Sequence, residues 1–464
     1  MSNNILVVGG GISGLAVLHY LKQKFAKRDD ISIFLLEKNS HAGGTIQSIR
    51  QNGYLFETGP NGFLNNKPRT IEFFESLGLK EDLMEASPEA QFRYISLNNK
   101  LYPIPANPKD FLLSPLLNPL EKIRILGEIF IPKGNNPQES IFEFGQRRLG
   151  KKFAEVFLDA MAAGIYGGDA REITLKAAFP RIYNLEQEYG SLFKAMFALK
   201  NNSASPKGFR IWLRRSKALG MPSGTLTSFR QGMGQCVQVL SQKYKEHIQF
   251  NQEVKSISLV QGQCKVESSG QPFLADELFL CCPSYSAARM LENAEPELAQ
   301  ILRKVSYAPI AVIGLTFKLK DFKSRPRGFG FLMPSSENKE VLGVLLDSNI
   351  FPQRAPEDKI LLRVMLGGAR FPDILKKSQE ELIQIAFKEL QNYFSIKNPP
   401  QETFFTAWPK AIPQYDRLYV SLQAELEQQL HALPSLHIVA NYWKGISFND
   451  CVENAFQAVE KFSI

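Results

Sequence analysis

The chain has 464 residues, of which 44% are hydrophobic and 22% are charged. These values fit a globular protein of about three domains and exclude a disordered or fibrous chain. The 55 basic and 46 acidic residues give a formal net charge of +9, which favours anionic partners. Apolar runs stay below the roughly 18 residues of a spanning helix, and a core strand starts the chain. We therefore expect a cytoplasmic protein without a signal peptide.

The first predicted strand, residues 5–8, runs directly into a glycine-rich turn at residues 9–14. A strand, this turn and a helix in succession form the dinucleotide fingerprint. Gly9 permits the tight turn, Gly11 allows the backbone to approach a pyrophosphate, and Gly14 lets the helix pack closely. The pyrophosphate is then expected at the N-terminus of that helix.

Glu37 ends the second predicted strand, residues 31–36. An acidic residue at this point can accept hydrogen bonds from both hydroxyls of a ribose, and it disfavours the 2′-phosphate of NADP. FAD, NAD and a related protein that binds neither remain open from the fingerprint alone.

Two further glycine turns follow Glu37, at residues 43–45 and 59–62. From residue 287 to about residue 403, strands with alternating patterns predict a largely antiparallel sheet that covers a substrate cavity. We expect Asn449 or Asp450 to cap a final helix whose positive end faces the cofactor. The remaining predicted elements are strands at 46–50, 54–57, 247–254, 278–283, 310–317, 341–347, 360–366 and 436–439, a hairpin through Gly262, and helices at 71–77, 140–148, 236–244 and 449–462.

Two stretches are candidates for membrane contact. Residues 111–120 form an apolar segment broken by prolines, and it either enters one leaflet or covers a hydrophobic pocket. Residues 193–217 mix basic and aromatic side chains, as in a membrane-surface segment or a solvated loop. Nucleic-acid binding is not expected, because no recognised module accompanies this stretch. The apolar segment continues with Ile123, Ile125, Leu126, Ile129 and Phe130, and the basic stretch contains Phe193, Lys194, Phe197, Lys200, Lys207, Phe209, Arg210, Trp212, Arg214, Arg215 and Lys217.

The five cysteines and five histidines form no recognisable metal or disulfide pattern. The cysteines lack the paired spacing of a zinc site, and no two histidines lie four residues apart with an acidic residue nearby. We therefore expect no metal site and reduced thiols in the core.

Four motifs spread along the chain carry a more specific resemblance. They are residues 56–63 (FETGPNGF), residues 164–179 with GIYGGD and KAAF, residues 408–415 (WPKAIPQY), and residues 445–455 with DCVE. Together they resemble the oxygen-dependent protoporphyrinogen and coproporphyrinogen oxidase family, within the FAD-dependent amine-oxidase superfamily. The match spans the whole chain.

The resemblance implies an α/β fold with three parts. One is a Rossmann-like FAD-binding domain of the p-hydroxybenzoate hydroxylase or amine-oxidase type, formed by residues 1–86, 224–286 and 404–464. The second is an α+β substrate-binding domain, formed by residues 87–108, 168–223 and 287–403. The third is a helical membrane-docking domain, residues 109–167.

One non-covalent FAD is implied, with the second glycine turn beside its pyrophosphate and the third beside its flavin ring. The residues predicted to contact it are Gly9, Gly11, Ile12, Ser13, Gly14, Glu37, Lys38, Gly44, Thr45, Gly59, Pro60, Asn61, Gly62, Val254, Trp408, Gly445, Ile446, Ser447 and Phe448.

The implied activity is oxidation of protoporphyrinogen IX to protoporphyrin IX in heme biosynthesis, in three two-electron steps. Only one nucleotide fingerprint occurs, so electrons are expected to enter the flavin from the substrate and to leave to oxygen or a quinone. No side chain is assigned as catalytic, because flavin N5 takes the hydride. Arg93 is predicted to bind a propionate, and Gly164, Leu332 and Phe351 to line the macrocycle site.

Several alternatives stay open. Coproporphyrinogen III, with four propionates, would favour more cationic partners. An amine or carotenoid oxidase is a third alternative, and a flavin-free interaction protein of the GDP-dissociation-inhibitor type is a fourth. The resemblance also suggests peripheral binding to the inner face of a membrane, a ferrochelatase partner and a homodimer. The candidate cationic partners for coproporphyrinogen are Arg171, Arg325, Arg327, Arg354 and Arg363.

Overall fold

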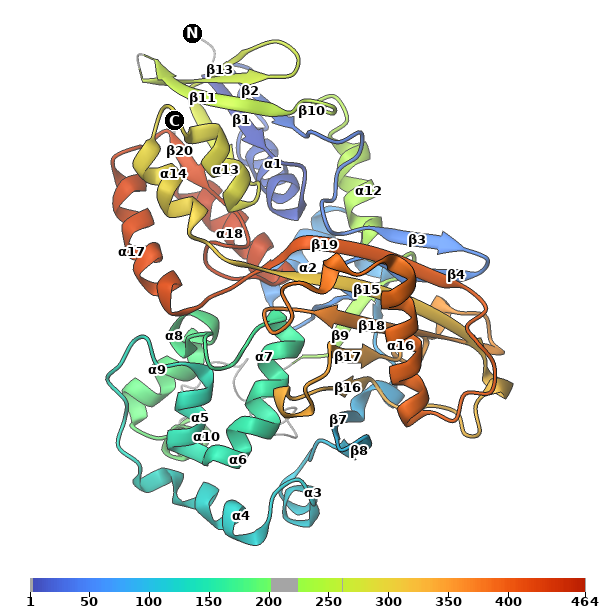
Figure 1. Ribbon diagram of the computed structural model, residues 1–464. Coiled ribbons are helices and arrows are strands. Elements are labelled where there is room, and N and C mark those ends of the chain that lie inside the picture. The colour runs from blue at the N-terminus through green and yellow to red at the C-terminus, as the bar shows by residue number, and fades with distance from the viewer. Residues whose placement is uncertain (1–2, 202–223, 261, 464) are drawn as a thin grey trace.

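Figure 1 shows the computed structural model, which describes residues 3–201, 224–260 and 262–463. A parallel sheet with its helices lies at one end, and both chain ends are there. A large sheet occupies the middle, and a cluster of helices forms the other end (Figure 1). Most of the basic stretch predicted at 193–217 lies outside the described residues.

The parallel sheet confirms the predicted Rossmann-like core. Its strands come from widely separated parts of the chain, and every neighbouring pair is parallel. Such pairing buries both faces of the strands, which explains the continuous apolar runs. The order is β10 (Ile248–Gln249), β2 (Ile31–Leu36), β1 (Asn3–Val8), β14 (Glu277–Leu280) and β20 (Leu436–Ile438).

Helices cover both faces of this sheet. Alternate residues of β1 divide between the two cores, with Ile5 and Val7 in one and Leu6 and Val8 in the other. The first core holds α1 (Ile12–Lys24), α2 (Pro68–Ser76), α12 (Gly234–Lys243) and α18 (Phe448–Lys461). The second holds α13 (Ser284–Leu291), α14 (Pro296–Arg303), α17 (Arg417–His431) and a small sheet of β11 (Val254–Val260), β12 (Gln263–Ser268) and β13 (Phe273–Ala275).

The middle sheet confirms the prediction of a largely antiparallel structure. It has seven strands, and only the pair β16–β7 is parallel. Helix α16 (Gln379–Tyr393) packs on one face. The order is β19 (Thr403–Pro413), β15 (Tyr307–Lys318), β18 (Lys359–Gly367), β17 (Val341–Leu345), β16 (Gly330–Leu332), β7 (Arg93–Leu97) and β8 (Lys100–Pro103).

Smaller elements join these layers. Among the described residues, no helix is long and apolar enough to cross a membrane. The helical end contains α3 (Pro108–Leu113), α4 (Pro119–Leu126), η3 (Gly127–Phe130), α5 (Ile141–Leu149), α6 (Lys151–Phe153), η4 (Ala154–Leu158), α7 (Asp159–Tyr166), α8 (Leu175–Ala178), α9 (Pro180–Tyr189) and α10 (Leu192–Asn201). The remaining connecting elements are β3 (Ser48–Gln51), β4 (Tyr54–Glu57), β5 (Phe63–Leu64), β6 (Leu83–Glu85), β9 (Leu226–Phe229) and α15 (Asp347–Ile350).

One sequence prediction about local structure is wrong, and another is right only in part. The strand expected at 247–254 is two elements, because Asn251 adopts a left-handed conformation (φ 57°) between β10 and β11. The last helix begins at Phe448, one residue before the expected start, and its N-cap is Ser447, whose side chain accepts from the Asp450 N–H at 3.1 Å. Asp450 takes part in the cap as expected, because its carboxylate accepts from the Ser447 N–H at 3.2 Å. Asn449 instead donates its side-chain N–H to the carbonyl of Leu64.

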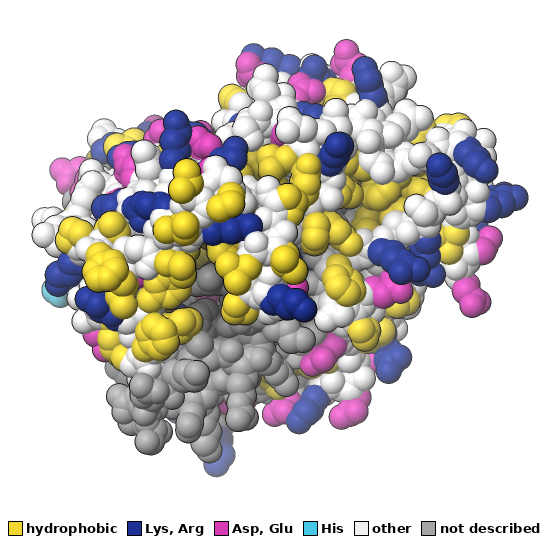
Figure 2. Space-filling model, turned by 90° about the horizontal axis from the view of Figure 1, so that it is seen from below, with side chains coloured by type: hydrophobic (Ala, Val, Ile, Leu, Met, Phe, Trp, Pro, Cys, Tyr) yellow, Lys and Arg dark blue, Asp and Glu magenta, His cyan; other side chains and the backbone are white. Residues whose placement is uncertain are grey.

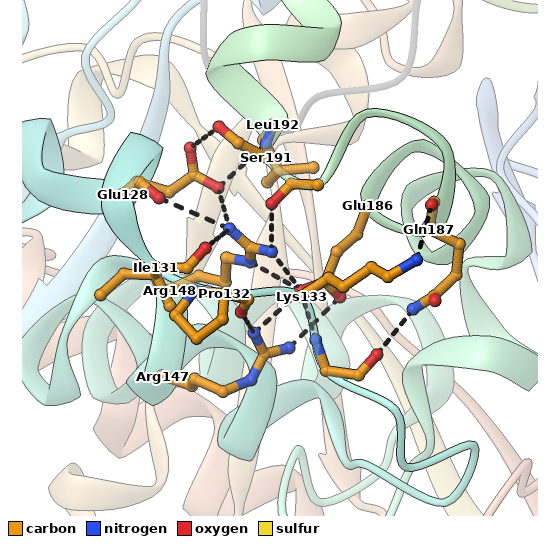
Figure 3. A network of polar contacts seen from close by, with 12 residues as sticks. Glu128, Ile131, Pro132, Lys133, Arg147, Arg148, Glu186, Gln187, Ser191 and Leu192 are labelled. Atoms are coloured by element: carbon orange, nitrogen blue, oxygen red, sulfur yellow. Dashed lines mark hydrogen bonds and ion pairs between the residues drawn. The ribbon is translucent and has the colours of Figure 1, made fainter.

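A buried cluster of charges holds the helical end together (Figure 3). The guanidinium of Arg148 lies between Glu128 (2.8 Å) and Glu186 (2.7 Å), and all three side chains are fully buried. The second carboxylate oxygen of Glu128 accepts from the Ser191 hydroxyl at 2.6 Å, at the start of α10. Because these residues come from α5, η3 and α9, one cluster fixes the positions of several short helices.

We expect Arg148→Ala to lower the free energy of unfolding by about 3–5 kcal/mol, because it leaves the buried Glu128 without its cation and Glu186 with Arg147 alone. Urea unfolding followed by circular dichroism measures this loss. Arg28→Ala is the control, because Arg28 pairs with Asp30 at the surface, and it should unfold like the unmodified protein. Equal effects of the two substitutions would contradict a structural role of the cluster.

Candidate functional site

The N-terminal turn has the geometry of an anion site. Gly9 has a φ of 107° and donates its N–H to the Leu36 carbonyl at 2.9 Å. Helix α1 begins at Ile12 after Gly11, and no side chain caps its first N–H groups. A Cβ at Gly14 would clash with the carbonyl of Gly9, whereas a Cβ at Gly11 would meet nothing within 4 Å. The turn is therefore closed on the protein side and open where a pyrophosphate would approach the helix N-terminus.

Glu37 ties this turn to the end of β2. Its buried carboxylate accepts from Gly10 N–H at 2.7 Å. It also accepts from the backbone N–H of Asn39 at 2.9 Å and from the side-chain amide of Asn39 at 2.8 Å. A carboxylate has about four acceptor positions, so these three bonds leave capacity for a ribose hydroxyl. The chain before Val254 lies alongside, because Gln252 N–H donates to the Glu37 carbonyl at 2.9 Å.

The three predicted glycine turns lie against one another. Gly43 N–H donates to the Gly10 carbonyl at 2.8 Å, and a Cβ at Gly44 would lie 3.6 Å from Gly11 Cα. The hydroxyl of Thr58, just before the third turn, donates to the Thr45 carbonyl at 3.2 Å. Turns more than 40 residues apart in the chain therefore form one continuous backbone surface.

Helix α18 brings a second N-terminus to this surface. Ser13 contacts Cys451 near the start of both helices, and Lys24 donates to the carbonyls of Val459 and Phe462 near their ends. Helices α1 and α18 are therefore parallel, with their positive ends on the same side. Phe448 packs against Phe63 directly after the third turn, with ring centroids 5.8 Å apart.

These residues fit a dinucleotide that lies across several segments of the chain. Gly11 leaves room for it, Glu37 offers an acceptor, and two helix N-termini favour its phosphates. Of the other residues predicted to contact it, Lys38, Gly44, Thr45 and Ser447 are exposed, Gly59, Pro60, Gly62, Trp408, Gly445 and Ile446 are half-buried, and Val254 and Phe448 are buried.

A buried charge network, which the sequence analysis did not identify, fixes the third turn. Arg363 donates to the Gly59 carbonyl at 3.0 Å, and Arg354 donates to the Asn61 carbonyl at 2.9 Å. Asp347 and Glu57 are the nearby carboxylates, 3.3 Å from Arg363 and Arg354 respectively. Burial raises the pKa of Glu57 and lowers the pKa of Arg354, since it disfavours both charges.

This network corrects one expectation. Arg354 and Arg363 were candidates to bind additional propionates, but both are almost completely buried and bonded to the protein. A signal for this was present in the sequence. Arg363 lies in the middle of an apolar strand, where a charged side chain needs a buried partner.

The residues predicted to contact the substrate form two neighbouring groups. The guanidinium of Arg93 lies 4.6 Å from the ring centroid of Phe329, and Phe329 packs against an apolar cluster that contains the fully buried Phe351. Burial lowers the pKa of Arg93. In the second group Gly164 faces Leu332, since a Cβ at Gly164 would lie 2.7 Å from Leu332 Cδ2.

Strands β7 and β16 connect the two groups, with Arg93 opposite Gly330 and Ile95 opposite Leu332. Gly164 is exposed and Leu332 half-buried. Phe329 was not predicted, although it is the accessible aromatic side chain beside Arg93.

We expect Gly11→Asp to give a folded protein without flavin, because the new carboxylate would lie where a pyrophosphate is expected. The visible absorbance of the purified protein and its circular dichroism measure the two properties. Gly11→Ala is the matched control and should fold equally well, since a Cβ there meets no atom. A Gly11→Asp protein that retains full flavin absorbance would place the cofactor elsewhere.

Curated relatives match almost the whole chain. A chloroplastic protoporphyrinogen oxidase of Nicotiana tabacum is 28% identical over 98% of this chain and 84% of its own. The coproporphyrinogen III oxidase of Staphylococcus aureus is 26% identical over 99% of both chains. The protoporphyrinogen oxidase of Bos taurus is 28% identical over 99% of this chain and 98% of its own.

Solved structures share the fold. A protein from Exiguobacterium, provisionally named protoporphyrinogen oxidase, superposes with a TM-score of 0.81 at 22% identity, over 99% of this chain and 98% of its own. A putrescine oxidase bound to putrescine gives a TM-score of 0.67 at 14% identity, over 99% of both chains. The model of flavin-containing amine oxidoreductases matches residues 12–461. The chain therefore belongs to this family and is an FAD-dependent oxidoreductase.

Proposed function

We propose that the protein oxidises protoporphyrinogen IX to protoporphyrin IX, with a non-covalent FAD and with oxygen as electron acceptor. The observation that carries this proposal is the full-length similarity to relatives of that name. A chain of contacts links the third glycine turn to the surroundings of Arg93. Asp347 accepts from Asn61 in the turn at 3.2 Å, and Phe329, which lies under Arg93, packs against the apolar cluster that contains Phe351.

In this proposal the side chains position the substrate, and none of them acts as a general acid or base. Bound FAD supplies the hydride acceptor. Arg93 holds a propionate, while Leu332 and Phe329 contact the macrocycle from the sheet side. Gly164, which has no side chain, lets Leu332 pack directly against α7. Three domains stay part of the proposal, with α8, α9 and α10 counted with the helical end, α13 and α14 with the parallel sheet, and β19 with the middle sheet.

Coproporphyrinogen III is the second candidate substrate, and a specific observation favours it. Arg325 and Arg327 are exposed, and they flank the loop that rests on Phe92 and Arg93. Phe329 N–H donates to the Phe92 carbonyl at 2.7 Å, which holds this loop beside Arg93. Two further cations at this edge suit a substrate with four propionates.

Arg171, the remaining candidate, lies 3.8 Å from Asp159 and 3.9 Å from Asp169 and is not part of this edge. The flavin-free alternative is not retained, because the chain belongs to a flavin oxidoreductase family.

Membrane contact at the helical end is also part of the proposal. Apolar side chains there are more than half exposed, and Phe130 is 86% exposed. Figure 2 shows this face, with hydrophobic side chains gathered over it and basic ones among them. Such a surface suits peripheral binding to the inner face of a membrane with anionic lipids. A ferrochelatase partner and a homodimer stay predictions from the resemblance. The exposed apolar residues are Leu112, Leu113, Leu120, Ile123, Leu126, Phe130 and Phe197.

Turnover of the two porphyrinogens tests the proposed function, with porphyrin fluorescence and peroxide as readouts. We expect product from at least one of them, and absence of porphyrin from both would contradict the proposal. Arg93→Ala should raise KM by an amount equivalent to about 2–4 kcal/mol, because it removes a charge-assisted contact in a buried setting. Arg303→Ala, at an exposed ion pair on α14, is the control and should leave KM unchanged.

Flotation with vesicles that contain anionic lipid tests the membrane contact. We expect the double variant Leu126→Asp/Phe130→Asp to lose binding, since each exposed apolar side chain contributes about 1.5–3 kcal/mol when it leaves water. Leu274→Asp is the control, because Leu274 is similarly exposed on β13 at the opposite end. Unchanged flotation of the double variant would show that this face does not bind the membrane.

A further inference from the structure

Helix α7 is attached to the middle sheet at its C-terminal end. The carbonyl of Gly167 accepts from Ala369 N–H at 2.7 Å, just after β18. The carbonyl of Tyr166 accepts from the side chain of Gln414 at 2.9 Å. This end of the helix therefore cannot move without the sheet.

A buried carboxylate attaches the other end. Asp159, the first residue of α7, is fully buried, and its Oδ2 accepts from Arg370 Nη2 at 3.0 Å and from Ser335 N–H. Arg370 also donates to the carbonyl of Met333 at 3.1 Å. Met333 follows Leu332 directly in the chain, and Ser335 comes two residues after Met333. One ion pair thus holds the segment that carries Leu332 against the start of α7.

The space around Leu332 is set by two glycines. A Cβ at Gly164 would lie 2.7 Å from Leu332 Cδ2, and a Cβ at Gly343 on β17 would lie 3.0 Å from the same atom. Contacts this short mean that a methyl group on either side would displace the leucine. The position of Leu332 therefore depends on the distance between α7 and β16, which the ion pair fixes.

We propose that Asp159 is a positioning residue, which holds Leu332, a side chain proposed to contact the macrocycle, in one position against α7. This inference deepens the proposed function and rests on it. A buried ion pair contributes little net stability compared with apolar packing, but it allows few alternative geometries. A flat macrocycle gains its binding energy from close contact with the side chains that line its site, so the position of Leu332 acts on binding more than on the chemical step.

The test is a double-mutant cycle with Asp159→Asn and Gly164→Ala, measured on the FAD-loaded enzyme. Each single variant should raise KM about tenfold and leave kcat nearly unchanged, because ground state and transition state lose the same contact. In the Asp159→Asn background, Gly164→Ala should raise KM less than about twofold, since β16 can then move away from α7 and make room for the added methyl group. Additive effects on KM, or a loss confined to kcat, would overturn the proposal.

Glu186→Gln is the matched control, because it removes a buried charge from the Arg148 cluster and touches neither Leu332 nor Gly164. It should lower the thermal midpoint without a change in KM. If Asp159→Asn does not fold, Arg370→Lys, which keeps the charge but shortens the reach to Met333, replaces it in the cycle. A wild type that oxidises neither porphyrinogen contradicts the proposed function. If the wild type oxidises a porphyrinogen but the effects of the two substitutions on KM are additive, only the proposed role of Asp159 is contradicted.

Discussion

The parallel packing of α1 against α18 is the constraint on which the cofactor site depends. Residues 12–24 and 448–461 come from opposite ends of the chain, and their helices start at the same edge of the parallel sheet. Each N-terminus carries roughly half a positive charge, so two adjacent ones form a strong anion site. Lys24 at the end of α1 donates to carbonyls at the end of α18, which fixes how far one helix is shifted along its axis relative to the other.

A second constraint links this site to the substrate side. The third glycine turn is attached to the middle sheet by Arg354 and Arg363, whose charges are balanced by Glu57 and Asp347. Burial of these groups is unfavourable unless every partner is in place. As a result, these bonds hold the backbone of the turn in one position on the middle sheet. A rigid turn suits an enzyme whose side chains contribute mainly orientation.

Local patterns in the sequence were enough to predict the parts of the site that local chemistry determines. Gly9, Gly14 and Glu37 could be assigned because a tight turn and a strand end demand these residues at fixed spacing. The start of α18 was missed by one residue, since Ser447, Asn449 and Asp450 are all acceptable caps and only packing of Phe448 on Phe63 selects among them. The apolar strand around Arg363 indicates a buried arginine, but the sequence does not say which groups it binds. The contacts of Arg354 and Arg363 with the third turn, and that of Asp159 with Arg370, could not be predicted, because these partners lie far apart in the chain.

Anaerobic mixing of the purified FAD-loaded enzyme with a porphyrinogen tests the central claim most directly, because it isolates electron transfer from substrate to flavin. We expect the visible absorbance of the oxidised flavin to disappear on mixing, because the first two-electron step reduces the flavin. Admitting oxygen should restore the absorbance and let porphyrin fluorescence appear, since porphyrin needs three two-electron steps and each one requires an oxidised flavin. A flavin that stays oxidised with both porphyrinogens but is reduced by an amine would contradict this claim.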